Sequence, residues 1–171
     1  MRIETGFAGF VREHTPALLR TAYLLTGDGV AAEELVQDTL VHLYPKWGRV
    51  ESAQVPLAYV RRSLANGYVT GRRRPSASRE LMMGQLPERA DGRDDVARVA
   101  DRDEVWALLG TLPQRQRAAL VLRYFHDQTD EEIAKALDCR PGTVRSLISR
   151  GLAALRERPP SSAGISTRRL A

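Results

Sequence analysis

The segment at residues 128–157, QTDEEIAKALDCRPGTVRSLISRGLAALRE, constrains the fold more than any other part of the chain. Thr129 and Glu132 form a T-x-x-E capping box, which opens a helix by satisfying two of its free amide groups. A turn over residues 138–140 follows. Pro141 then suits the first position of a second helix, where no amide hydrogen is needed. The segment predicts two short helices joined by a tight turn.

The second of these helices has one apolar and one polar face. Its apolar residues recur every three or four positions, so we expect them to be buried together: Val144, Ile148, Leu152 and Leu155. Five polar residues then face outward: Thr143, Arg145, Ser146, Ser149 and Arg150. Short hydrogen-bond donors and guanidinium groups suit base edges and phosphates in a major groove. The pattern predicts a helix-turn-helix that reads DNA; the alternative is a helical hairpin whose arginines are only solvated.

Composition bounds the class of protein. The chain has 171 residues, 43% hydrophobic and 27% charged, enough for one ordinary core or two small ones. A net charge of +5 modestly favours nucleic acid or an anionic membrane surface as a partner. A single cysteine excludes an internal disulfide, and three scattered histidines lack metal-ligand spacing. We expect a cytoplasmic protein without metal, cofactor, membrane insertion or export signal.

Apolar periodicity predicts helices along most of the chain and no strand. We expect one helix around Phe7 and Val11, a second over residues 17–25 capped by Thr15 and Pro16, and a third over about residues 30–46. A turn over residues 48–56 leads to a fourth helix, which runs into a basic cluster at residues 72–74. Helical periodicity resumes at residue 96 and breaks at residues 112–113.

Two segments lack the apolar periodicity that packing requires. Residues 75–95 are rich in Ser, Gly, Pro, Asp and Arg and are predicted to be a flexible linker. Residues 159–171 are predicted to be a disordered tail. The expected fold class is all-α, with two small helical domains joined by the flexible linker and the helix-turn-helix in the second.

Two separate stretches of the chain, in the right order, resemble one family. LPQRQRAALVLRYFHDQTDEEIAKALDCRPGTVRSLISRGLAALRE closely resembles the promoter-reading domain of extracytoplasmic-function sigma factors, the small alternative specificity subunits of bacterial RNA polymerase. LLRTAYLLTGDGVAAEELVQDTLVHLYPKW resembles the polymerase-binding part of sigma domain 2, and PLAYVRRSLANGYVTGRRR resembles its promoter-melting helix. In particular, the chain is similar to the SigE-like actinobacterial group, and the resemblance covers about residues 5–158.

This resemblance implies a function for each domain. Residues 5–74 would be sigma domain 2, which binds core polymerase and recognises and melts the minus-ten element, and residues 96–158 would be sigma domain 4, which reads the minus-thirty-five element. The implied polymerase-binding residues are Glu34, Gln37 and Asp38. The implied minus-ten residues are Tyr59, Arg61, Arg62, Asn66, Arg72, Arg73 and Arg74. The implied minus-thirty-five residues are Arg140, Thr143, Arg145, Ser146, Ser149 and Arg150.

The resemblance also implies partners. These are promoter DNA, core RNA polymerase, through the clamp of its largest subunit and the flap of the second, and an anti-sigma factor, which is membrane-bound in many relatives. The polymerase performs the chemistry, so the chain would not itself be an enzyme, and the sequence shows no acid-base or metal constellation. The promoter sequence and the inducing signal stay open.

A stand-alone helix-turn-helix regulator is the alternative function. The output domains of response regulators share the pattern of Glu132, Ile133, Ala134, Thr143 and Val144. Such regulators usually carry a sensing or phosphoacceptor domain, and nothing in residues 1–74 resembles one. A sigma factor is therefore the preferred interpretation.

The helix-turn-helix turn departs from the family pattern at two positions. Asp138 replaces the usual glycine and is expected to adopt a left-handed conformation. Arg140 replaces the common serine cap, which costs about 1 kcal/mol unless Pro141 preorganises the turn.

Overall fold

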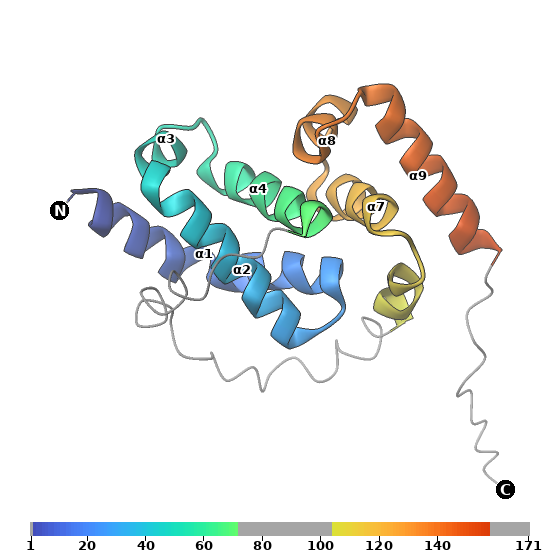
Figure 1. Cartoon of the computed structure of the whole chain (residues 1–171), viewed down its shortest axis with the longest axis horizontal. Helices are drawn as coiled ribbons and strands as arrows, with labels where there is room; N and C mark the ends of the chain where they lie inside the picture. The colour runs from blue at the N-terminus through green and yellow to red at the C-terminus, as the bar shows by residue number, and fades with distance from the viewer. Residues whose placement is uncertain (1, 72–103, 158–171) are drawn as a thin grey trace, which may run out of the picture.

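The computed structural model describes residues 2–71 and 104–157, and these ranges contain helices and turns but no strand (Figure 1). The N-terminal unit, residues 2–71, contains α1 (Arg2–Thr26), α2 (Gly29–Leu43), the 3-10 turn η1 (Tyr44–Lys46), α3 (Trp47–Glu51) and α4 (Pro56–Thr70). The C-terminal unit, residues 104–157, contains a helical segment at 104–110, α7 (Gln114–His126), α8 (Asp130–Leu137) and α9 (Pro141–Arg156). The all-α prediction is confirmed; the predicted linker and tail lie outside the described residues.

One continuous helix, α1, replaces the two helices predicted before residue 26, so that prediction is wrong. Pro16 lies inside the helix and removes one backbone donor, a disruption of about 3 kcal/mol. The fully buried side chains form a stripe along both halves of α1: Phe7, Val11, Leu18, Ala22 and Leu25. Burial of each larger apolar side chain contributes about 1.5–3 kcal/mol, so the shared stripe outweighs the proline.

Local capping residues determine where α1 ends and α2 begins. Gly27, at φ 71°, ends α1 as predicted, and the Asp28 carboxylate accepts a hydrogen bond of 2.8 Å from the Ala31 amide to begin α2. The predicted third helix is interrupted earlier than expected, because Pro45 forces the 3-10 turn after Leu43. Part of the predicted turn over residues 48–56 is instead α3, which the buried Trp47 anchors against Phe7 and Phe10.

The helix-turn-helix forms as its sequence predicts. The Thr129 hydroxyl accepts from the Glu132 amide, and the Glu132 carboxylate accepts from the Thr129 amide, so the capping box is confirmed. Asp138 has a left-handed conformation with φ 49°, and α9 begins at Pro141. Arg140 precedes it in an extended conformation and makes no side-chain cap hydrogen bond. Proline at the first helical position therefore replaces a side-chain cap.

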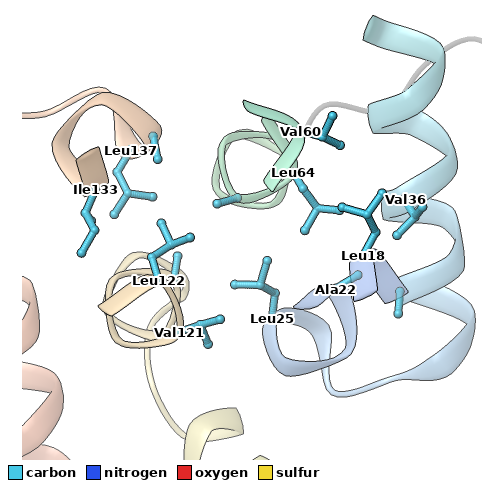
Figure 2. Close-up of a cluster of buried hydrophobic side chains, with 14 of the residues drawn as sticks. Leu18, Ala22, Leu25, Val36, Val60, Leu64, Val121, Leu122, Ile133 and Leu137 are labelled. Atoms are coloured by element: carbon cyan, nitrogen blue, oxygen red, sulfur yellow. The ribbon is translucent and has the colours of Figure 1, made fainter. Parts of the chain in front are cut away.

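The two units pack directly against each other and share one cluster of buried apolar side chains. Helix α1 lies beside α7, and α4 lies beside both α7 and α8. Figure 2 shows Leu25 of α1 facing α7, which carries Val121 and Leu122, whereas Leu64 of α4 points toward α1 and α2 inside the N-terminal unit. All four are less than 2% exposed. The unit that carries the helix-turn-helix is therefore held on the end of α1 and the side of α4.

Candidate nucleic-acid and polymerase interface

The polar face of α9 is open to solvent. Val144 is fully buried, and Ile148, Leu152 and Leu155 pack against the core. The polar residues expected to read DNA are all exposed: Arg140, Thr143, Arg145, Ser146, Ser149 and Arg150. Gly151, on the buried side, brings α9 close to α7, since an added Cβ there would lie 2.8 Å from Leu120 Cδ1. The burial pattern leaves one continuous donor-rich surface suited to a DNA groove.

Asp130, in the first turn of α8, pairs with arginines from two neighbouring helices. One carboxylate oxygen accepts from Arg123 of α7, and the other lies 3.3 Å from Nη1 of Arg145 of α9. The Arg145 side chain is 66% exposed. It can therefore exchange this carboxylate for a DNA acceptor without unpacking the core.

Helix α4 divides the predicted minus-ten residues between two sides. Tyr59, Arg62 and Asn66 follow one another at spacings of three and four and share one face. The Arg62 guanidinium lies 5.1 Å from the centre of the Tyr59 ring, a cation–π distance. Arg61 lies on another side of the helix, and Arg72, Arg73 and Arg74 lie outside the described residues. The structure brings together three of the seven predicted residues.

Arg61 lines a groove of about 820 Å³ between the two units, together with residues of α1, α7 and the segment at 104–110. Burial, and then the charge of Arg20, lower the pKa of Arg61. His126 lines the same groove, and its Nε2 lies 2.9 Å from the Thr21 hydroxyl. Burial, and then the charge of Arg61, lower the pKa of His126 to about 4. The imidazole is therefore neutral at physiological pH.

The face of α4 that carries Asn66 meets the helix-turn-helix. Its side-chain amide donates a hydrogen bond of 3.2 Å to the Ala136 carbonyl near the end of α8. Asn66 is half-buried, whereas Ala136 and Leu137 are fully buried. The predicted strand-melting residue is thus in contact with the other unit.

The three residues predicted to bind polymerase lie on α2. Glu34 is exposed, and Gln37 and Asp38 are half-buried one turn further along the same face. Val36 is buried and Leu35 packs against the core, so the polar side chains lie on the rest of the helix surface. The three polar side chains form a compact surface patch of the kind that meets basic side chains of a partner.

Arg117 of α7 is a residue that sequence reasoning missed. It is only 5% exposed, and its Nε donates a hydrogen bond of 2.8 Å to the Leu24 carbonyl of α1. Burial lowers the pKa of this guanidinium, while the neighbouring Tyr68 has the opposite influence. The available signal is its position in the apolar stripe with Leu120 and Val121. An arginine at such a position indicates a buried polar contact.

Neither a metal site nor a membrane-spanning helix is found in the part of the chain that the structure describes. Within residues 2–71 and 104–157, no three His, Cys, Asp or Glu side chains come together as a metal site. In the same ranges, no helix combines the length and hydrophobicity needed to cross a bilayer.

Comparisons with known proteins identify both units. Residues 10–77 match the family described as Sigma-70 region 2, and residues 102–155 match Sigma-70, region 4. The chain is 37% identical over 151 residues to the RNA polymerase sigma-E factors of Streptomyces avermitilis and Streptomyces coelicolor. These alignments cover 88% of the chain, and 83% and 84% of the two relatives. It is also 28% identical to the ECF RNA polymerase sigma factor SigL of Mycobacterium tuberculosis, covering 84% of the chain and 83% of that protein.

A solved structure shares the arrangement of helices. The sigma factor RpoE from Bartonella quintana, in complex with the anti-sigma factor NepR, aligns with a TM-score of 0.60 and 26% identity. The alignment covers 87% of the chain and 95% of RpoE. The chain therefore belongs to the extracytoplasmic-function sigma factors of the sigma-70 family, the alternative sigma factors that direct RNA polymerase to promoters.

Proposed function

We propose that the N-terminal unit binds core polymerase and opens the minus-ten element, while the C-terminal unit reads the minus-thirty-five element. The exposed α9 face is the observation that carries this division. Its arginines and hydroxyls project from a helix whose opposite side is buried, so they can reach base edges and phosphates in a major groove. Residues 5–74 and 96–158 are the proposed domains, with residues 75–95 as the linker.

Helix α4 would hold the non-template strand. Tyr59 can stack on an unpaired base, Asn66 can offer hydrogen bonds to a base that leaves the helix, and Arg62 can hold a phosphate. The shared face of these three residues supports the assignment. Arg61 and the basic cluster at residues 72–74 would bind phosphates of the same DNA strand, further along it.

The α2 patch would dock on the clamp of the largest polymerase subunit. Glu34, Gln37 and Asp38 present carboxylate and amide groups at spacings of three and four, which can fix the register of a basic partner helix. The C-terminal unit would meet the flap of the second subunit. The polymerase would supply all the chemistry, and the chain would act in the cytoplasm without an enzymatic activity of its own.

An anti-sigma factor is the proposed regulatory partner. The RpoE chain that aligns over 95% of its length is itself in complex with an anti-sigma factor, which supports such a partner for this chain. We further propose that this anti-sigma factor is attached to a membrane.

Charge reversal on α2 tests the docking assignment. Glu34→Lys with Asp38→Lys should abolish co-elution with core polymerase, because like charges would then face the clamp. The matched control is Glu13→Lys with Glu104→Lys, which changes the net charge equally at exposed positions away from α2. Circular dichroism should show the same helix content in both variants. Undiminished co-elution of the α2 variant would overturn the docking site.

A further inference from the structure

The groove between α1, α4, α7 and the segment at residues 104–110 has the size of a small-molecule site. Its volume is about 820 Å³, and binding sites for small molecules in proteins range from about 300 to about 1,000 Å³. Such sites are common where two structural units meet, which is where this groove lies. Its walls come from both units, so a bound molecule would contact both of them.

Apolar side chains form much of the groove wall. Val105 is 39% exposed and Phe125 is 49% exposed, and both line the groove. The ring of Tyr23 lies 3.9 Å, centre to centre, from the ring of Trp106, so these two aromatic side chains form a continuous part of the wall. Exposed apolar surface that gathers in a hollow favours a ligand with an apolar body.

Two arginines give the groove a positive charge. Arg20 of α1 and Arg61 of α4 both line it, and the charge of Arg20 acts, after burial, to lower the pKa of Arg61. Among the described residues, neither guanidinium has an ion-pair partner, and the exposed Asp127 carboxylate on the groove lining pairs with neither of them. Two like charges held close together are stabilised by an anion that binds both.

Two residues of the groove also carry buried N–H donors without an acceptor. Nε of Arg61 and Nε1 of Trp106 are buried and have no hydrogen-bond partner within residues 2–71 and 104–157. An unpaired buried donor is costly, so a nearby group that accepts hydrogen bonds stabilises the site. His126 adds no further charge, because its Nε2 lies 2.9 Å from the Thr21 hydroxyl and its pKa is lowered to about 4. The groove therefore suits a ligand with acceptor atoms and a negative charge.

We propose that this groove binds a small carboxylate with an apolar body, such as a fatty acid or an aromatic acid. The carboxylate would accept hydrogen bonds from the guanidinium groups of Arg20 and Arg61, in the planar geometry that these groups share. The apolar body would lie along Trp106 and Phe125. A single carboxylate is preferred to a phosphate, because Asp127 and the apolar walls disfavour a second negative charge.

This site goes beyond the promoter function and does not depend on it. Tyr59, Arg62 and Asn66, which share the proposed minus-ten face of α4, do not line the groove. The experiments below use the full chain without polymerase or DNA. Their failure leaves polymerase docking and promoter recognition standing, whereas failure of the α2 charge reversal leaves the carboxylate site standing.

Isothermal titration calorimetry with sodium decanoate and with 2-naphthoate tests the site. The two probes share the carboxylate and differ in an aliphatic or an aromatic body, so the comparison identifies the body that the walls accept. The corresponding amides keep the body and lose the charge. At least one acid should bind as one molecule per chain, about ten-fold or more tightly than its amide, since a charged hydrogen bond governs about that factor. Binding of neither acid, or equal binding of acid and amide, would overturn the proposal.

Substitution of single arginines separates the groove from the rest of the positive surface. Arg61→Met and Arg20→Met should each weaken binding of the acid about ten-fold. Arg62→Met is the matched control, because Arg62 is next to Arg61 on α4 and does not line the groove. Arg20 is exposed, so Arg20→Met keeps the test available if Arg61→Met does not fold. Unchanged binding in Arg20→Met, or an equal loss in Arg62→Met, would contradict the site.

The fluorescence of Trp106 locates the bound acid. The chain has two tryptophans, and Trp47 is buried in the N-terminal unit and does not line the groove. In a Trp47→Phe background, the acid should change the Trp106 emission with the dissociation constant that calorimetry gives. Neither inorganic phosphate nor a thymidine oligonucleotide should displace it. Unchanged emission would place the acid elsewhere, and displacement by either competitor would make the groove a phosphate or DNA contact; each of these results would overturn the proposal.

Discussion

Arg145 of α9 and Asp130 of α8 form an ion pair, with Nη1 of Arg145 3.3 Å from the Asp130 carboxylate. The pair holds the arginine at the DNA-facing side of the helix-turn-helix, beside the turn. An exposed pair of this kind contributes little to stability, typically about 0–1 kcal/mol. The ion pair matters instead because it orients the Arg145 guanidinium.

Arg145→Ala is expected to weaken binding of the holoenzyme to duplex promoter by about 1–3 kcal/mol, with relaxed preference at one base position. Electrophoretic shift on promoter duplexes that differ at single positions measures both effects. Arg156→Ala, on the same helix, is the control and should not change the base preference. A uniform loss across all sequences would make Arg145 a phosphate contact.

Asn66→Ala is expected to act at a later step. Duplex affinity of the holoenzyme should change little, while strand opening slows because the extruded base loses its hydrogen-bond partner. Permanganate reactivity of unpaired thymines reports opening, and electrophoretic shift reports binding. If the variant lost duplex affinity as Arg145→Ala does, yet kept its permanganate reactivity per complex, the melting role of α4 would be wrong.

The capping box of α8 predicts a stability effect. Thr129→Ala removes the hydroxyl that accepts from the Glu132 amide, and the free energy of unfolding should fall by about 1 kcal/mol. Urea denaturation followed by circular dichroism measures the change. Thr143→Ala, an exposed threonine inside α9, should cost less than half as much. Equal losses in the two variants would contradict the capping contribution.

His126 predicts a pH dependence of stability. Its pKa is lowered to about 4 in the folded chain, by burial first and by Arg61 second, so the unfolded chain takes up the proton at a higher pH. Between pH 6.5 and 4 the unfolded state binds more protons, and stability falls as the pH falls. With allowance for solvent screening, the loss is about 1 kcal/mol between pH 7 and 5.

Urea denaturation at the two pH values checks this expectation. His126→Gln keeps a group that can hydrogen-bond to Thr21 and cannot take up a proton in this range. The variant should lose less stability than the wild type on acidification. An identical pH dependence in both chains would assign the effect to carboxylates elsewhere.

Local signals in the sequence were sufficient for the helix-turn-helix. The capping box at Thr129, the proline at position 141 and the period of Val144 and Ile148 each act over a few residues, and all three agree with the structure. The left-handed Asp138 was also predictable, because the chain must turn there. The exposed face of α9 follows directly from these features.

Interactions between distant residues were harder to predict. Pro16 suggested a break in α1, but the buried stripe on both sides of it keeps the helix continuous. The contact between the units includes a hydrogen bond from Arg117 to the backbone carbonyl of Leu24, and a backbone carbonyl has no residue signature. Arg61 was grouped with Asn66 by sequence similarity, although the helical turn places them on different sides.

Promoter-directed initiation is the most direct test of the central assignment. The full chain would be mixed with actinobacterial core polymerase and genomic DNA fragments, and the transcript ends would be sequenced. The account predicts transcripts that start at a defined set of sites sharing minus-ten and minus-thirty-five elements, and that are lost with Glu34→Lys and Asp38→Lys. If the chain bound promoter fragments alone and added no start sites to core polymerase, it would act as a stand-alone regulator and the account would be wrong.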